Sequence, residues 1–158
     1  MALLLGWIAL GVAAFAGEAL PTQDGGTLIA VSVADQGGEP VEDAVVFLAR
    51  APEAAFELPA EPYVMAQQGA QFVPGMLTVL AGGKVSFPNR DDFHHHIFSF
   101  SKTRTFDLPL SKGKSPPPLV FDKVGVVQIG CNIHDHMRAV ILVVPSPYFV
   151  KTGKDGKA

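Results

Sequence analysis

The spacing of Cys131, His134 and Met137, each separated from the next by two residues, is the feature of this sequence that most restricts its fold. Apolar runs rich in β-branched residues flank these positions at 124–129 and 139–144, and such runs are typical of strands. A tight loop that closes two paired strands can turn every third side chain toward one centre. The segment therefore predicts a β-hairpin whose loop brings sulfur and nitrogen donors together.

Short strands separated by turn signals are predicted along the rest of the chain. The sequence holds 16 Gly and 13 Pro, which favour turns, and 48% of its residues are hydrophobic, enough for a core. It contains no amphipathic helix pattern, repeat or heptad. Besides the two runs that flank the cysteine loop, strands are expected at 27–33, 44–48, 76–80, 85–87 and 97–100. This pattern predicts an all-β fold, an antiparallel sandwich or barrel.

Two segments are expected to be turns or loops. Ala81–Lys84 carries two glycines between two predicted strands, which is typical of a hairpin turn. Residues 102–118 are polar and end in three prolines, a run that neither a strand interior nor a helix interior accepts. We therefore expect a loop over this segment.

Residues 1–16 contain no charged residue and end in Ala14-Phe15-Ala16, a small-x-small cleavage pattern. The segment is short for a membrane span, which needs about 20 apolar residues. We therefore predict a secretory signal peptide cleaved after Ala16 and a periplasmic protein. An uncleaved membrane anchor, or a start codon placed too far downstream, is the alternative, because no Lys or Arg precedes the apolar run.

Export affects the chemistry expected of Cys131. A lone thiol in an oxidising compartment is a liability unless something occupies it, and this chain has no second cysteine to pair with it. A metal ion bound to the thiolate would protect it.

The net charge of −3 argues against a nucleic-acid partner, which normally requires a basic patch. After signal cleavage no association with a membrane is expected either.

A thiolate, two imidazoles and a weak axial thioether form the donor set of a blue-copper centre. The cysteine loop supplies one thiolate, one imidazole and one thioether, so the second imidazole must come from elsewhere. The run His94–His96 is the candidate, and it opens the predicted strand at 97–100. Because side chains alternate across a strand, only one of these three histidines need face the site.

Each part of this pattern also has a simpler explanation. The histidine run could be a polar surface loop, Cys131 a small buried residue and Met137 an ordinary core residue. A tetrahedral zinc site of Cys131, His134 and His136 with one histidine of the run is a sharper alternative. Structural zinc sites usually have more thiolates, however, and zinc leaves Met137 without a role. A nucleophilic Cys131 with His134 as its base leaves both Met137 and the histidine run unexplained.

Two motifs resemble those of the cupredoxins, specifically of the plastocyanin and amicyanin type. In the first, Asn89 comes two residues after the aromatic Phe87, His95 comes six residues after Asn89, and Ile97 stands where that family has Val. In the second, Cys-x-x-His-x-x-Met is similar to the short amicyanin-like ligand loop, and Gly125 begins the approach to it. The segment Cys-Asn-Ile-His-Asp also resembles the corresponding segment of plastocyanin-like proteins of methylamine utilisation. The resemblance covers residues 63–145.

The resemblance implies a Greek-key β-sandwich that holds one type 1 copper ion. His95, Cys131 and His134 would form the trigonal plane, and Met137 the axial contact. Three neighbouring positions depart from the family's pattern. His94 replaces a Pro, His96 replaces an Asn that ties the two ligand loops together by hydrogen bonds, and Asn132 replaces a Ser or Thr. Such neighbours orient the ligands and tune the metal, so the reduction potential is left open.

The expected organisation is a signal peptide at 1–16, one cupredoxin-like domain at 22–147 and a flexible tail at 148–158. Within the domain, residues 22–50 resemble an opening hairpin of the kind found in carboxypeptidase-regulatory-like modules. Residues 63–145 would form the copper-binding core.

The resemblance implies an electron carrier rather than an enzyme, because a buried copper without an open position has no place for a substrate. The His134 ring edge would reach the surface and pass electrons to a redox protein such as a c-type cytochrome or a dehydrogenase. The charges expected near the mouth are mixed: Arg90, Asp91, Asp92 and Arg138. The alternative is a periplasmic copper-binding or delivery protein without a redox role, which the extra histidines favour. Two of them, His96 and His136, could form a second, weaker metal site.

Overall fold

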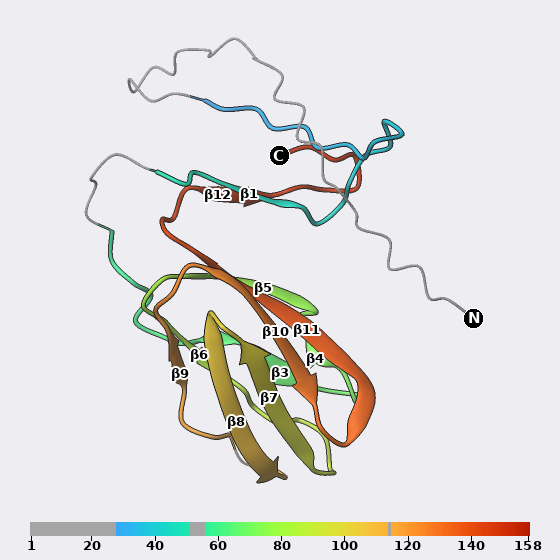
Figure 1. Cartoon of the computed structure of the whole chain (residues 1–158), viewed down its shortest axis with the longest axis vertical. Helices are drawn as coiled ribbons and strands as arrows, with labels where there is room; N and C mark the ends of the chain where they lie inside the picture. Colours follow the sequence, from blue (N-terminus) through green and yellow to red (C-terminus); the bar gives the residue numbers. More distant parts are fainter. Residues whose placement is uncertain (1–27, 51–55, 114) are drawn as a thin grey trace. The chain divides into compact units, whose positions relative to one another are not determined.

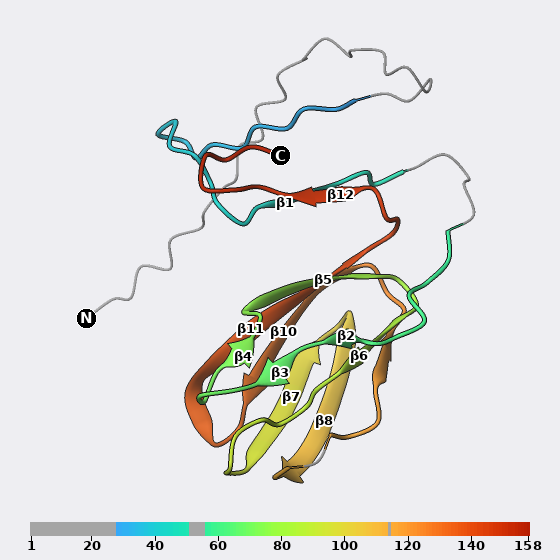
Figure 2. The ribbon, with the colours of Figure 1, turned by 180° about the vertical axis from the view of Figure 1, so that it is seen from behind.

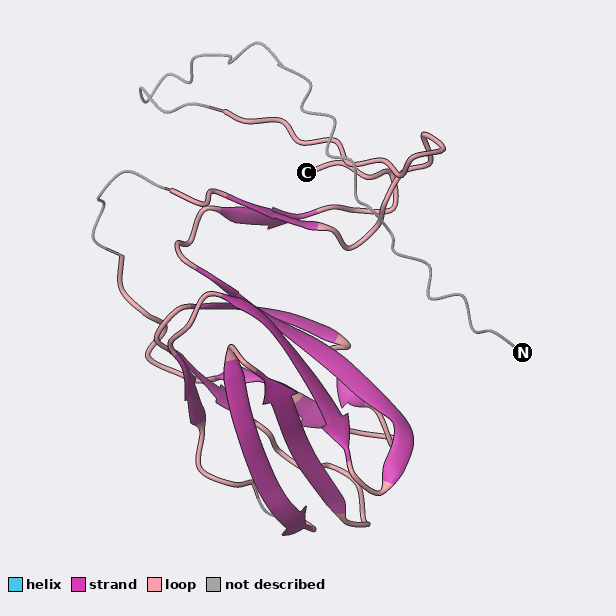
Figure 3. Cartoon of the chain, in the orientation of Figure 1, coloured by secondary structure: helices cyan, strands magenta, loops and turns pink. Residues whose placement is uncertain are grey.

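The computed structural model describes residues 28–50, 56–113 and 115–158, and the predicted signal peptide at 1–16 lies outside this part of the chain. The described residues form strands and loops without a helix, as Figure 3 shows. They accordingly include no helix that is long and apolar enough to cross a membrane. The chain divides into two compact units, Phe47–Tyr148 and a smaller one that joins the residues up to Val46 with Phe149–Ala158.

The larger unit is a β-sandwich, and Figures 1 and 2 show its two layers from opposite sides. One layer is a five-stranded sheet in the order β5-β11-β10-β7-β8. Its strands are β5 (Met76–Leu80), β7 (His95–Ser101), β8 (Arg104–Ser111), β10 (Gly125–Cys131) and β11 (His134–Val144). The other layer contains a sheet in the order β2-β6-β9 and the pair β3-β4. Its strands are β2 (Tyr63–Val64), β3 (Ala66–Gln67), β4 (Phe72–Val73), β6 (Gly83–Ser86) and β9 (Leu119–Phe121).

The core between the layers follows from the alternation of side chains along the strands. In β10 every second residue from Val127 to Cys131 is buried, and in β11 every second residue from Met137 to Val143. Phe87 and Phe121 are fully buried and meet at 6.5 Å between ring centroids. All of these side chains belong to one hydrophobic cluster. The two sulfur-bearing side chains of the predicted site are therefore part of the core.

The predicted all-β fold class is confirmed. The strands expected at 76–80, 97–100, 124–129 and 139–144 correspond to β5, β7, β10 and β11. The sandwich was expected to be antiparallel, but two of its pairings, β5 with β11 and β2 with β6, are parallel.

The prediction of a hairpin turn at Ala81–Lys84 was wrong. β5 and β6 lie in different sheets, because the chain changes layer at this point. The Ala81 N–H donates to the carbonyl of Val144 in β11, and the Gly82 N–H donates to the carbonyl of Phe121 in β9. Gly82 has a φ of 90°, a left-handed conformation that glycine adopts without cost to a side chain. Two glycines thus marked a turn without indicating which strands pair.

The loop predicted at 102–118 was also wrong, since β8 occupies much of it. Inward and outward side chains alternate along β8, but the inward ones are only partly buried. Phe106 and Leu108 pack against the core, while Asp107 and Pro109 are exposed. A proline is tolerated here because β8 is the edge strand of its sheet. The proline run expected to break regular structure lies beyond the end of this strand.

The smaller unit pairs two segments from opposite ends of the chain, β1 (Val45–Phe47) and β12 (Phe149–Lys151). Thr152 is buried beside them, where its hydroxyl accepts from the Ala44 N–H and donates to the Val41 carbonyl. Of the strand expected at 27–33, the described residues 28–33 contain no strand, and Ser32 forms an isolated bridge with Lys157. The predicted organisation, one domain at 22–147 followed by a flexible tail at 148–158, stays a prediction.

Candidate metal centre

The hairpin of β10 and β11 positions the cysteine loop. Its pairing is regular as far as Gly130 opposite Arg138, after which Cys131 lies opposite His134. The pairing therefore skips three residues of β11, and the turn itself is only two residues long. In a regular strand, residues three apart point to opposite faces. The irregularity in the pairing removes that restriction, so that His134 can face Cys131 while Met137 is buried in the core.

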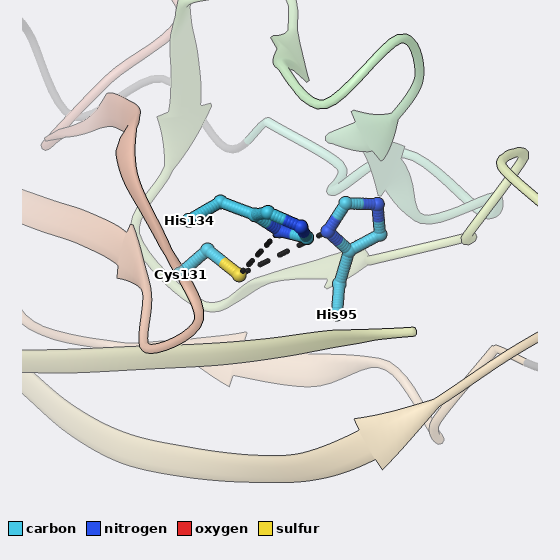
Figure 4. Close-up of side chains that lie close together, drawn as sticks. All are labelled: His95, Cys131 and His134. Atoms are coloured by element: carbon cyan, nitrogen blue, oxygen red, sulfur yellow. Dashed lines mark hydrogen bonds between the residues drawn. The ribbon is translucent and has the colours of Figure 1, made fainter. Parts of the chain in front are cut away.

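Three of the four predicted ligands converge, as Figure 4 shows. The Cys131 Sγ atom lies 3.5 Å from Nδ1 of His134 and 3.8 Å from Nδ1 of His95. His95 is fully buried at the start of β7, which runs beside β10 with Cys131 opposite Ile97. Strand pairing thus brings together two side chains that are 36 residues apart in the sequence.

The spacing of these donors fits a single metal ion. Bonds of about 2.3 Å to sulfur and about 2.0 Å to nitrogen, as in zinc sites, place trigonal neighbours about 3.7 Å apart. The three donors of His95, Cys131 and His134 all lie within 4.8 Å of one another, and no other group of three His, Cys, Asp or Glu residues in the described chain does so. A thiolate with two imidazoles, followed by a methionine three residues later, is typical of a single type 1 copper site.

Met137 is the predicted ligand for which the structure gives no distance to the other three. Its side chain is 1% exposed and belongs to the hydrophobic cluster that also contains Cys131. This burial agrees with an axial thioether and equally with an ordinary core methionine. The assignment of all four residues as metal ligands therefore stays a prediction.

Asp91 is a residue of the site that the sequence analysis misplaced. It was expected among the surface charges at the mouth, but its side chain is only 9% exposed and lies 2.8 Å from Nε2 of His95. The spacing of four residues between Asp91 and His95 was visible in the sequence. In a loop without periodicity, however, such spacing does not predict a contact.

The pKa of Asp91 is lowered from its usual value of 3.8. Burial raises this pKa, but the backbone N–H groups of Ala70 and Gly69 and the ring of His95 together outweigh burial. The same groups hydrogen-bond the carboxylate, which favours its ionised form. Asp91 is thus a carboxylate at neutral pH, in contact with a predicted ligand.

The two ligand loops are joined through the backbone. His96 stands where the resemblance implies an Asn that ties the loops by hydrogen bonds. Here the Asn132 N–H donates to the His96 carbonyl at 2.9 Å. The connection between β7 and the cysteine loop therefore does not depend on the side chain at position 96.

The remaining histidines lie outside the cluster. His94 is exposed, and Nε2 of the half-buried His96 is hydrogen-bonded to the carboxylate of Asp107 on the neighbouring strand. The ring of the exposed His136 is 6.3 Å from that of His134, centroid to centroid. The described residues contain no group of three or more potential ligands that corresponds to the alternative zinc site with His136. The second, weaker metal site of His96 and His136 stays a prediction.

One aromatic side chain lies over both imidazoles. The Phe93 ring is 5.0 Å from that of His95 and 5.6 Å from that of His134, centroid to centroid. Phe93 is 39% exposed, and Ile133, which precedes His134 in the chain, is 47% exposed, whereas His134 is half-buried. The cluster therefore approaches the surface on the His134 side.

Comparisons with known proteins identify the fold. No protein-family model matches this chain, and no curated protein matches its sequence. Among solved structures, the copper-containing nitrite reductase from Thermus scotoductus SA-01 is 23% identical with a TM-score of 0.52. The match covers 64% of this chain and 27% of the reductase, so this chain spans about a quarter of that protein's length.

Two smaller proteins are also similar. An amicyanin variant in its reduced Cu(I) form is 22% identical over 64% of this chain and 99% of its own, with a TM-score of 0.49. A purple cupredoxin from Nitrosopumilus maritimus is 22% identical over 51% of this chain and 98% of its own, with a TM-score of 0.45. The match with the reductase, whose TM-score exceeds 0.5, and the all-β sheets identify the fold as that of a cupredoxin.

Proposed function

We propose that this protein is a type 1 copper protein that carries electrons in the periplasm. The observation that carries the proposal is the convergence of Cys131 Sγ with the Nδ1 atoms of His95 and His134, at 3.8 and 3.5 Å. Copper bound by these donors would accept and release one electron. Met137 is assigned the axial contact.

The environment of the cluster suits this role better than catalysis. Cys131 and His95 are buried in the core, which excludes water from the donors and holds them in place. A site that is fixed before the metal binds changes little between oxidation states. His134 is half-buried, so it is the donor through which electrons would enter and leave. The protein is proposed to be a carrier and not an enzyme.

The partner is proposed to be a redox protein, such as a c-type cytochrome or a dehydrogenase, that docks over His134. The exposed Phe93 and Ile133 provide apolar contact beside the half-buried ring. A transient contact of this kind is small, below about 1,200 Å². Because Asp91 is turned inward, only Arg90, Asp92 and Arg138 of the four charges expected near the mouth are exposed. The periplasmic location is proposed from the apolar segment at 1–16.

The proposal is tested by adding Cu(II) to the purified protein and recording its visible spectrum. A thiolate bound to Cu(II) gives an intense band toward the red end, and we expect this band in the natural protein and its absence in Cys131→Ser. His136→Asn is the matched control, since His136 lies outside the cluster and its loss should leave the band unchanged.

The alternative function, copper binding and delivery, predicts a different spectrum. A pale complex in the natural protein, or a band that survives Cys131→Ser, would contradict the electron-carrier proposal. A pale complex that releases copper readily to a chelator would favour delivery, with the exposed His94 and His136 as the first groups to meet the ion.

A further inference from the structure

The two nitrogen atoms of His95 have different neighbours. Nδ1 faces Cys131 Sγ at 3.8 Å, and Nε2 lies 2.8 Å from Oδ2 of Asp91. An ionised carboxylate can only accept a hydrogen bond, so the proton of the neutral imidazole must be on Nε2. That tautomer leaves the lone pair of Nδ1 directed at the sulfur. The contact with Asp91 thus prepares the nitrogen that would bind the metal.

The Asp91 carboxylate is itself held by the turn between β3 and β4. The Gly69 N–H donates to Oδ1 at 2.6 Å, and the Ala70 N–H donates to Oδ2 at 3.0 Å. Both turn residues have positive φ, 64° and 53°, as in a two-residue type I′ turn. An alanine is uncommon in this region of φ. The turn therefore keeps an unfavourable backbone conformation in which two N–H groups converge on one carboxylate.

The backbone that carries Asp91 is also fixed. Its N–H donates to Oδ1 of Asn89 at 2.9 Å, and Nδ2 of Asn89 donates to the Phe93 carbonyl at 2.8 Å. The Arg90 N–H donates to the Gln67 carbonyl at 2.9 Å, which joins the loop to β3. A continuous set of hydrogen bonds thus runs from the β3–β4 turn through Asp91 to His95.

We propose that Asp91 is a positioning residue of the copper centre, which fixes the tautomer and orientation of His95 and strengthens Nδ1 as a donor. This inference rests on the proposed function and deepens it. A negative charge beside a ligand stabilises the oxidised, more positive ion more than the reduced one. Asp91 therefore holds the reduction potential of the bound copper below the value it would have beside a neutral residue.

The first test uses the metal-free natural protein and needs no variant. Nitrogen-15 NMR near neutral pH reports which ring nitrogen of His95 carries the proton. We expect the proton on Nε2, in slow exchange with water because the ring is buried. A proton on Nδ1, or rapid interchange between the two nitrogens, would overturn the proposal.

The second test compares two substitutions that remove the same charge from adjacent residues. Asp91→Asn takes it from the side chain that contacts His95, and Asp92→Asn takes it from an exposed neighbour. Asp91→Asn should weaken the binding of Cu(II) relative to Cu(I) by about tenfold. For a one-electron couple this corresponds to a rise in reduction potential of about 59 mV. The rise for Asp92→Asn should be much smaller.

The outcomes separate the two proposals. If both variants shift the reduction potential equally, Asp91 acts only through its charge, as an exposed carboxylate would. If neither variant shifts it, Asp91 only stabilises the turn. Either outcome would show that this inference is wrong. If the natural protein forms no thiolate–copper band, the proposed function fails instead. The tautomer measurement still decides whether Asp91 orients His95 in that case, because it involves no metal.

Discussion

The two imidazoles of the candidate copper centre are held in contrasting ways. His95 is 0% exposed, opens a strand in the sheet and contacts a polar neighbour at each ring nitrogen. His134 is half-buried, follows a two-residue turn that ends in the exposed Ile133, and packs against the exposed Phe93. One imidazole is thus fixed from within the sandwich, while the other stands at its edge.

This difference suggests that the two sides of the site have different roles. On the His95 side, hydrogen bonds through Asp91 hold the ring in place before any metal binds, which would limit rearrangement during the proposed electron transfer. On the His134 side, the ring is near enough to the surface for a partner to approach it. Donor strength would then be set on the buried side and contact with partners on the exposed side.

The largest effect is expected from removing the atom that the two sides share. Cys131→Ser should eliminate the intense visible band of the Cu(II) protein and lower its affinity for Cu(II) by more than about 100-fold, because both imidazoles lose their common thiolate neighbour. Titration with Cu(II), followed by absorbance and by competition with a chelator, measures both quantities. A variant that kept the band would place the thiolate outside the site.

The next largest effect should distinguish the two imidazoles directly. His134→Gly opens a gap near the surface, so added imidazole should enter it and restore the band. His95→Gly opens a gap in the core, closed off by the layers of the sandwich, and restoration there should need far more imidazole or fail. Equal rescue of the two variants would show that the burial difference does not control access.

A smaller effect is expected in the dependence of stability on pH. A carboxyl whose pKa is lowered on folding stabilises the protein above its unfolded pKa, here near 3.8, and this contribution is lost as the pH falls through the lower folded pKa. The metal-free natural protein should therefore be about 2 kcal/mol more stable than Asp91→Asn near neutral pH. Urea unfolding at several pH values should show the difference shrinking below pH 3.8. Asp92→Asn should show no comparable difference at any pH.

The smallest effect is expected from Phe93→Ala. This ring packs on both imidazoles but is 39% exposed, so its loss should cost about 1 kcal/mol of stability. The visible band should persist, because no donor is removed. Added imidazole should enter the His134→Gly gap faster in the double variant, and an unchanged rate would mean that Phe93 does not cover the His134 side.

The correct and incorrect predictions differ in the range of the interactions involved. The strands around the cysteine loop were predicted because each is a run of apolar, largely β-branched residues, which is a local feature of the sequence. The edge strand β8 was missed because its exposed residues include Pro109 and its inward residues are only partly buried. The turn at Ala81–Lys84 was recognised, but the sequence did not indicate that the chain changes layer there.

The sequence alone determined the donors, since the single cysteine, its spacing from His134 and Met137, and the separate histidine run limit the chemistry to a few choices. The resemblance already named His95 as the histidine that completes the set, but only the tertiary structure decided which of its nitrogen atoms faces the sulfur. Pairing of β7 with β10 brings His95 to Cys131, and hydrogen bonds from the β3–β4 turn aim Asp91 at the far side of the ring. These contacts join segments distant in the sequence, and their geometry depends on how the strands pair and not on any local pattern of residues.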